Sequence, residues 1–287
     1  IMAFRQCGIV GLGLLGGSLA FDLRAAFPEL EIVGVARRKD TLLAAAELRV
    51  GGAPVFTELS REFSALGNAD LIFICTPVQT IIQQLAELAH VAAPGAVITD
   101  VGSTKRMVMN AAVAALPANI TFIGGHPMAG REQGGLGAAM PNLYLHATWA
   151  LCVPAGAEAA GERLAEVITA IGAQPRRIDA CTHDEIVALT SHLPHVTAAA
   201  LANVVLGGNF DEVARQFIAG GFRDTTRVAT GVPEMWRDII LTNRDQILPA
   251  LDALITELAH WRDAVRNGDA PYLEALLATA AQRRGAL

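Results

Sequence analysis

Two kinds of segment alternate along the first 180 or so residues of the chain. Short apolar runs of strand length are separated by longer stretches whose apolar residues recur at helical spacing. Strands that alternate with helices predict an α/β fold with a mainly parallel, doubly wound sheet of the Rossmann type. The predicted strands are residues 7–10, 31–38, 69–77, 96–103, 121–127, 147–154 and 175–179.

The strand pattern ends near residue 180, and the rest of the chain is helical in character. We therefore predict a dinucleotide-binding Rossmann domain over residues 1–180 and a helical substrate and dimerisation domain over residues 181–287. The predicted helices are residues 182–206, 210–219, 233–266 and 270–283.

The predicted helix at 233–266 is unusually long, with Pro249 as an expected kink. Its apolar residues form one continuous stripe that must be covered. Either the same domain or a second subunit can cover it, and we expect a homodimer through the C-terminal helices. The stripe consists of Trp236, Ile240, Ile247, Leu251, Leu254, Leu258, Trp261 and Val265.

The composition describes a folded globular chain and excludes several classes of protein. Of the 287 residues, 52% are hydrophobic and 17% are charged, and no apolar run reaches the roughly 18 residues of a membrane helix. A net charge of −6 gives no attraction for nucleic acid. The first residues show no signal-peptide pattern, so we expect a cytoplasmic protein. The cysteines Cys7, Cys75, Cys152 and Cys181 are far apart, which favours reduced core residues over a disulfide or zinc site.

A glycine pattern of the G-x-G-x-x-G type follows the first predicted strand and opens a helix. In a dinucleotide site the first glycine permits a tight turn, the second lets the backbone approach the pyrophosphate, and the third allows close helix packing. A structural glycine turn is the alternative, but the surrounding strand–helix–strand order favours a cofactor. The predicted cofactor loop is Gly11, Leu12, Gly13, Leu14, Leu15 and Gly16.

The end of the second predicted strand bears on the choice between NAD and NADP. An NAD site usually has an acidic residue there, which binds the ribose 2′-hydroxyl. This chain instead has Ala36 followed by Arg37, Arg38 and Lys39. Two guanidinium groups suit a 2′-phosphate, so we predict NADP, with NAD as the alternative and a solvated basic loop as the structural explanation.

Polar residues follow three further predicted strands. Thr76 and Pro77 follow the third strand, Ser103 follows the fourth, and His126 ends the fifth within the stretch GGHPMAG. The carboxyl ends of parallel strands meet at one edge of the sheet, so these groups should converge beside a nicotinamide. The glycines around His126 would let its loop crowd against ligand, although a tight turn with an incidental histidine is the alternative. Ser103 is also a candidate N-cap for a helix beginning near Lys105.

Six motifs give the chain a family resemblance. GLGLLGGSLA, CTPV, DVGSTK, GGHPMAG, SHLPH and GFRDTTR together resemble the prephenate and arogenate dehydrogenases of tyrosine biosynthesis, over nearly the whole chain. The resemblance implies a nicotinamide domain followed by a helical domain with dimer contacts. It also implies a reaction in which a cyclohexadienol is oxidised at its ring hydroxyl carbon and loses its ring carboxylate as carbon dioxide.

The resemblance further implies roles for individual residues. His126 would hydrogen-bond the ring hydroxyl and take up its proton, which suits a neutral imidazole, and Ser103 would contact the same hydroxyl. Arg227 would bind a substrate carboxylate, with Asp224 three residues earlier to hold its side chain. The remaining candidate substrate contacts are Glu132, Arg223, His192, His195 and Trp236.

Several of these candidates have structural alternatives. A surface ion pair explains Arg223 equally well, a solvated loop carboxylate explains Glu132, and the apolar stripe explains Trp236. His192 and His195 are three apart, around Pro194, and we favour His195 as the substrate contact and His192 as part of the site wall. No metal motif accompanies them. The other histidines, His90, His146, His183 and His260, have no supporting motif.

Prephenate and arogenate differ at the end of the side chain, where prephenate has a keto group and arogenate has an ammonium group. An extra cation such as a histidine favours prephenate, whereas an acidic neighbour such as Glu132 or Asp224 favours arogenate, so we predict prephenate and leave dual use open. Tyrosine inhibition by competition is a further expectation. The rival enzymes are β-hydroxyacid dehydrogenases, which need a lysine that this chain lacks after Lys105, and pyrroline carboxylate reductases. A cofactor-binding sensor is the alternative outside enzymes.

Overall fold

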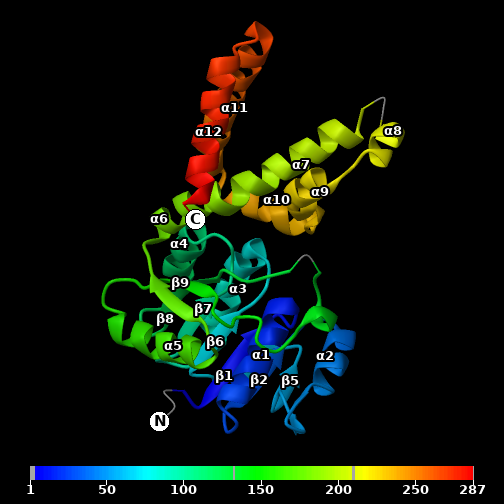
Figure 1. Cartoon of the computed structure of the whole chain (residues 1–287). Coiled ribbons are helices and arrows are strands. Elements are labelled where there is room, and N and C mark those ends of the chain that lie inside the picture. The colour runs from blue at the N-terminus through cyan, green and yellow to red at the C-terminus, as the bar shows by residue number, and fades with distance from the viewer. Residues whose placement is uncertain (1–3, 132, 209–210, 287) are drawn as a thin grey trace.

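The structure of this chain is a computed structural model that describes residues 4–131, 133–208 and 211–286. An eight-stranded sheet with helices on both faces forms the N-terminal part, and helices alone form the C-terminal part above it (Figure 1). The predicted fold class is confirmed.

The sheet has the strand order β10-β9-β8-β7-β6-β1-β2-β5. From β5 to β8 all neighbours are parallel, whereas β9 runs antiparallel to β8 and parallel to β10. The chain turns to opposite sides of β1 to form β2 and β6, and ligands bind at such switch points. Each predicted strand has a counterpart, while β5 and the short β3–β4 ribbon were not predicted. The strands are β1 (Gln6–Val10), β2 (Glu31–Val35), β3 (Arg49–Val50), β4 (Ala53–Pro54), β5 (Glu58–Ser60), β6 (Leu71–Ile74), β7 (Val97–Asp100), β8 (Thr121–Pro127), β9 (Thr148–Cys152) and β10 (Gln174–Arg177).

Two apolar cores hold the helices against the sheet. On one face, side chains such as Leu19 of α1 and Leu164 of α5 pack on the strands, and α2 joins them. On the other face, Leu85 of α3 and Val108 of α4 form the second core. The helices of this part are α1 (Leu14–Ala26), α2 (Lys39–Ala46), η1 (Phe63–Leu66), α3 (Val78–Val91), α4 (Arg106–Ala115), η2 (Leu136–Ala138) and α5 (Glu158–Ala170).

The C-terminal part begins directly after the last strand, close to the predicted domain boundary at residue 180. The first predicted helix is interrupted by a π-helical turn, η3, just before Pro194, whose ring cannot donate a backbone hydrogen bond. The elements are α6 (Ala180–Val187), η3 (Ala188–His192), α7 (Leu193–Leu206), α8 (Asp211–Gln216), α9 (Gly220–Thr226), η4 (Arg227–Thr230), α10 (Pro233–Thr242), α11 (Arg244–Asn267) and α12 (Ala270–Gly285).

The prediction of a single helix over residues 233–266 is wrong. The chain breaks at Asn243, which has φ −122° and ψ 22°, and Pro249 lies inside the second helix, α11. The Asn243 side chain is fully buried and bonds to Asp184 and His192. The helix therefore breaks at a residue whose side chain makes tertiary hydrogen bonds. The pattern of apolar residues along the sequence gives no sign of such bonds.

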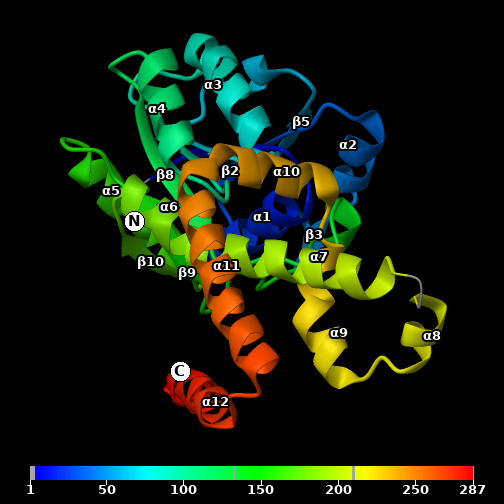
Figure 2. The same cartoon turned by 90° about the horizontal axis from the view of Figure 1, so that it is seen from above.

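Helices α11 and α12 form a hairpin that projects from the body of the molecule (Figures 1 and 2). Ile247, near its base, is buried, whereas Leu258 and Val265 farther out are exposed over 56% and 65% of their surface. Leu258 and Val265 of the predicted stripe are thus not covered within the chain, whereas Leu251, Leu254 and Trp261 are partly covered. Among the described helices, none is both long and apolar enough to span a membrane. The exposed apolar residues of the hairpin include Leu248, Ile255, Leu258, Val265, Tyr272 and Leu277.

Candidate active site

A cleft of about 680 Å³ lies at the carboxyl ends of β1, β6, β7 and β8, with η3, η4 and α10 on its opposite side. Its volume suits a small-molecule site. The predicted convergence of polar groups at the strand ends is therefore seen in the structure. The predicted site residues that line the cleft are Gly13, Leu14, Leu15, Thr76, Pro77, Ser103, His126, His192 and Trp236.

The glycine loop fits the backbone of a dinucleotide. Gly11 has φ +92°, a conformation that residues with a Cβ rarely adopt. A Cβ on Gly13 would meet nothing within 4 Å, so its backbone is open to a ligand, whereas a Cβ on Gly16 would lie 2.0 Å from the Gly11 carbonyl oxygen. The three glycines thus permit the turn, the close approach and the close packing that a pyrophosphate site needs.

The basic residues 37–39 after β2 have an acidic partner that the sequence analysis did not consider. The Arg38 guanidinium pairs with both carboxylate oxygens of Asp40 and lowers the pKa of that carboxyl to about 2. Arg61, which follows the neighbouring strand β5, donates to the Arg37 carbonyl oxygen at 3.0 Å. A carboxylate is therefore present beside Arg38, contrary to expectation, and a further cation lies beside Arg37.

His126 lies within strand β8, paired with Ala150 of β9, and not in a loop. Its Nδ1 is 2.8 Å from Nε2 of His183, and Nδ1 of His183 is 2.8 Å from the Asp184 carboxylate. His183 and Asp184 come from α6 and are both buried. The three side chains form a continuous hydrogen-bonded row that ends at the cleft.

The acceptor at the far end of the row fixes the direction of its hydrogen bonds. An ionised carboxylate only accepts, so His183 donates from Nδ1, and the Nε2 of a neutral His183 then accepts. His126 must donate from Nδ1 to that nitrogen, which leaves its own Nε2 with a lone pair. The row therefore holds His126 in the tautomer that a general base requires.

Asp184 also joins the two parts of the chain. Its carboxylate accepts the backbone N–H groups of Lys105 and Arg106, at 2.8 and 3.0 Å, at the start of α4. The predicted N-cap role of Ser103 is wrong, because a carboxylate from α6 satisfies these donors and no side chain of the cap residue does. Ser103 instead lies on the cleft wall.

A buried ion pair holds the peptide that precedes His126. Lys105 Nζ donates to the Asp100 carboxylate and, at 2.6 Å, to the carbonyl oxygen of Gly125, while the Gly125 N–H donates to Asp100 at 3.0 Å. A Cβ on Gly125 would lie 2.3 Å from the Asp100 carbonyl oxygen. Gly125 thus lets protein pack closely on protein, which corrects the expectation that it brings a loop against ligand. Gly130, after His126, does line the cleft, and a Cβ there would meet nothing within 4 Å.

The surroundings of His126 keep it neutral. Burial lowers the pKa of His126 well below its usual value, and the positive charges that His183, Lys105 and His192 carry when protonated lower it further. An uncharged imidazole is the form that can accept a proton.

On the helical side, the two histidines of SHLPH occupy different positions. His192 lines the cleft, and burial lowers its pKa to about 4. His195 stacks on the Trp236 indole, with ring centroids 3.4 Å apart, and does not contribute to the described cleft lining. In this structure Trp236 and His192 therefore form the wall, and burial lowers the pKa of His195 as well.

The predicted charged substrate contacts lie away from the described lining. Arg223, Asp224 and Arg227 are exposed on α9 and at the start of η4, although Val228, the next residue, does line the cleft. Glu132 lies outside the described residues. The structure brings His126, Ser103, His192 and Trp236 together in the cleft. The substrate-binding role of the charged residues around Arg227 stays a prediction.

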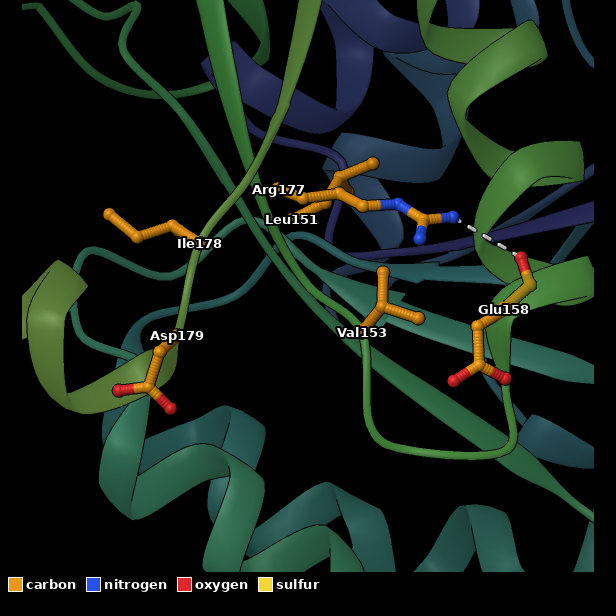
Figure 3. Close-up of a pocket in the computed structure, with 6 residues that line it drawn as sticks. All are labelled: Leu151, Val153, Glu158, Arg177, Ile178 and Asp179. Carbon is orange, nitrogen blue, oxygen red and sulfur yellow. Dashed lines mark hydrogen bonds between the residues drawn. The ribbon is translucent and has the colours of Figure 1, made fainter.

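A second hollow, of about 400 Å³, lies at the β10 edge of the sheet (Figure 3). Its charged groups already have partners within the chain. Arg177 donates to the Glu162 carboxylate at 2.6 Å and to the Glu158 carbonyl oxygen at 3.4 Å, and Asp179 caps α6. We assign no chemistry to this hollow.

Among the described residues, no three or more His, Cys, Asp or Glu side chains are placed so that together they could hold a metal ion. All four cysteines are free, and Cys181 is exposed, so it is not the core residue that the sequence suggested.

Sequence reasoning missed His183, Asp184, Asn243 and the Lys105–Asp100 pair. His183 and Asp184 are adjacent, and a histidine next to a carboxylate was a weak signal that could have been followed. Asp100 and Lys105 both belong to DVGSTK, a motif that was noted only for Ser103. Asn243 had no signal in the apolar pattern.

The fold and the cleft define a class: a dehydrogenase with a dinucleotide-binding sheet and a helical second domain. The family model described as the prephenate dehydrogenase nucleotide-binding domain matches residues 19–175, and the model of the prephenate dehydrogenase dimerization domain matches residues 179–279. The chain belongs to the prephenate dehydrogenase family.

Similar proteins support this assignment. The prephenate dehydrogenase of Bacillus subtilis is 35% identical over 282 residues, which are 97% of this chain and 75% of that protein. The crystal structure of Synechocystis arogenate dehydrogenase has a TM-score of 0.81 and 32% identity, covering 98% of this chain and 99% of that one. Prephenate dehydrogenase from A. aeolicus, in complex with hydroxyphenyl propionate and NAD+, has a TM-score of 0.89 and 26% identity, covering 100% and 99%.

Proposed function

We propose that this chain catalyses the oxidative decarboxylation of prephenate to 4-hydroxyphenylpyruvate. The observation that carries the proposal is the row from Asp184 through His183 to His126, which ends in an imidazole lone pair at the cleft. This is the group that the ring hydroxyl of such a substrate needs.

The chain's residues act on the proton of that hydroxyl. His126 accepts it as hydride leaves the same ring carbon, which prevents positive charge from building there. The resulting imidazolium is stabilised through His183 by the Asp184 carboxylate. The carbon–carbon bond to the ring carboxylate then breaks, carbon dioxide leaves, and the bonding electrons make the ring aromatic. His126 returns the proton to the oxygen, so the product is a phenol. Ser103 orients the hydroxyl.

A nicotinamide dinucleotide supplies the hydride acceptor. The residues that would hold it are the loop Gly11–Gly16 and Thr76, Pro77 and Ser103 at the strand ends. We propose NADP over NAD because Arg37 and Arg38 follow β2 and Arg61 lies beside them. Asp40 opposes this preference because it pairs with Arg38, so NAD is the alternative.

Charged groups of the helical domain would bind the substrate carboxylates. We propose Arg227 for this role, with Asp224 holding the Arg227 side chain and Arg223 as a further cation of the same segment. Glu132 is proposed separately, as an acidic residue at the mouth of the pocket. His192, His195 and Trp236 would contact the rest of the substrate. A chain with net charge −6 needs such local guanidinium groups to attract a dianion.

A homodimer through the C-terminal helices is part of the proposal. The match to a dimerization-domain model and the exposed apolar residues of the α11–α12 hairpin support it. Competitive inhibition by tyrosine and a cytoplasmic location are further proposals, the second supported by four free cysteines.

Paired kinetics test the function. We expect reduction of NADP or NAD on addition of prephenate, with carbon dioxide released, and a higher kcat/KM with NADP than with NAD. Arogenate is measured in parallel, since an arogenate-specific NADP enzyme is the second candidate and the Synechocystis relative is named arogenate dehydrogenase. Cofactor binding without turnover of either substrate would instead favour a sensor or another dehydrogenase.

A further inference from the structure

His192 faces the cleft with a ring whose orientation is set by a neighbour. The side chain is buried in η3, lines the cleft, and meets the edge of Trp236 with ring centroids 6.2 Å apart. Its Nδ1 is 3.2 Å from Nδ2 of Asn243, and Nε2 has no hydrogen-bond partner among the described residues. The nitrogen that remains for a ligand is therefore Nε2.

The amide orientation of Asn243 decides which nitrogen of His192 carries the proton. Asn243 Nδ2 lies 2.8 Å from the carbonyl oxygen of Asp184, and a carbonyl oxygen only accepts. The amide nitrogen must therefore face it, because a flipped amide would place oxygen against oxygen. The second hydrogen of the same nitrogen points to His192 Nδ1, which must accept it.

A neutral His192 then has its proton on Nε2. Burial lowers the pKa of His192 to about 4, so the ring is uncharged near neutral pH. The expectation that an extra cationic histidine selects prephenate does not apply to this ring. The structure instead offers the cleft a neutral N–H donor.

We propose that Asn243 fixes this tautomer so that His192 Nε2–H donates to the keto oxygen of the substrate side chain and thereby selects the keto acid over the amino acid. A keto oxygen accepts such a bond. An ammonium group only donates, so it would meet the same N–H unfavourably. A histidine free to change tautomer could offer a lone pair to the ammonium, and Asn243 prevents this. The inference rests on the proposed function, since it concerns prephenate and arogenate.

The first test needs no substrate. Long-range ¹H–¹⁵N spectra of the full-length protein, with His192 assigned by comparison with His192→Gln, should show Nε2 protonated and Nδ1 unprotonated at pH 7. Asn243→Ala should release this preference. An Nδ1–H tautomer or an imidazolium in the wild-type protein would overturn the proposal.

The second test measures selectivity. His192→Leu should lower the ratio of kcat/KM for prephenate to that for arogenate by about tenfold, the loss of one neutral hydrogen bond. His192→Gln, which keeps an amide donor, should recover most of it, and Asn243→Ala should lower it less than His192→Leu. Asn119→Ala, in an exposed loop, is the control and should leave the ratio unchanged.

Binding of the products provides a readout without turnover. The affinity for 4-hydroxyphenylpyruvate relative to tyrosine should fall by the same factor in His192→Leu, since these products differ by the same keto and ammonium groups. Unchanged ratios in an active enzyme would refute this inference alone. If the wild-type chain neither oxidises prephenate nor binds its product, the proposed function fails and the recognition step fails with it, while the spectra still decide the tautomer.

Discussion

The two walls of the cleft are held in different ways. On the sheet wall, His126 is backed by buried side chains in a continuous hydrogen-bonded arrangement: His183, Asp184, Lys105 and Asp100. On the helical wall, Trp236 and His192 form the surface, and the charged candidates Arg223, Asp224 and Arg227 are exposed outside the described lining.

This difference separates proton transfer from recognition. Groups that stabilise a transition state act best when their orientation is fixed before the substrate arrives. Groups that attract an anion from solution must remain accessible to it. We therefore expect changes on the sheet wall to lower kcat, and changes on the helical wall to alter KM and substrate choice.

The largest effect should follow from replacing the base itself. His126→Asn should lower kcat by about two to four orders of magnitude, because a positioned general base contributes about that much, and should leave KM nearly unchanged. Steady-state kinetics with prephenate measure both, and His90→Asn, exposed at the end of α3, is the control. A near-normal kcat would reduce His126 to a structural residue.

The sharpest contrast with this result should come from the helical wall. Arg227→Ala should mainly raise KM, by about 2–5 kcal/mol or at least roughly thirtyfold, because a substrate carboxylate would lose its charged partner. Initial rates over a wide range of prephenate concentration test this, with Arg283→Ala on α12 as the control. An unchanged KM together with a lower Tm would show that Arg227 is structural.

A smaller loss of kcat is expected one step behind the base. His183→Asn should lower kcat by about ten- to a hundredfold. The variant removes the imidazole that links His126 to the Asp184 carboxylate, so the imidazolium formed at His126 is stabilised less. Single-turnover measurements separate this step from product release. If the unfolding free energy falls together with kcat and the pH profile of kcat is unaltered, His183 has no role in proton transfer.

The smallest effect on turnover, but a clear shift with pH, is expected for the ion pair. His126 must be unprotonated to act, and its lowered pKa keeps kcat/KM high below pH 6.5 until the pH falls through that pKa. Lys105→Met removes a positive charge, so the pKa of His126 should rise and the acid limb should move to higher pH. The variant should also lose about 3–5 kcal/mol of stability, because Asp100 is left buried and unpaired.

The double variant Asp100→Asn/Lys105→Met controls for that stability loss. It should recover part of the lost unfolding free energy, and because it also removes the negative charge of Asp100, its acid limb should return toward the wild-type position. Denaturation curves and pH profiles measure the two effects separately. An acid limb that does not move in Lys105→Met itself would exclude the charge of Lys105 as a cause of the lowered pKa of His126.

Much of the fold and the cofactor side of the cleft could be predicted because their signals are local. Glycine spacing, apolar runs and the positions of Thr76, Ser103 and His126 after strands are all readable within a few residues. The residues that hydrogen-bond to the cleft-lining histidines could not be predicted in this way. His183 meets His126 across 57 positions, and Asn243 meets Asp184 across 59. The first pair joins α6 to β8 and the second joins α6 to the α10–α11 junction, and such long-range packing is not recorded in any short window of sequence.

Asp184 has one further consequence. Its carboxylate accepts N–H groups from the start of α4 and from His183, so a single residue both joins the helical part to α4 and orients the base. Catalysis then depends on the assembly of both parts of the chain. If the hydrogen bonds of Asp184 were lost, the enzyme would lose activity while the Gly11–Gly16 loop kept its shape.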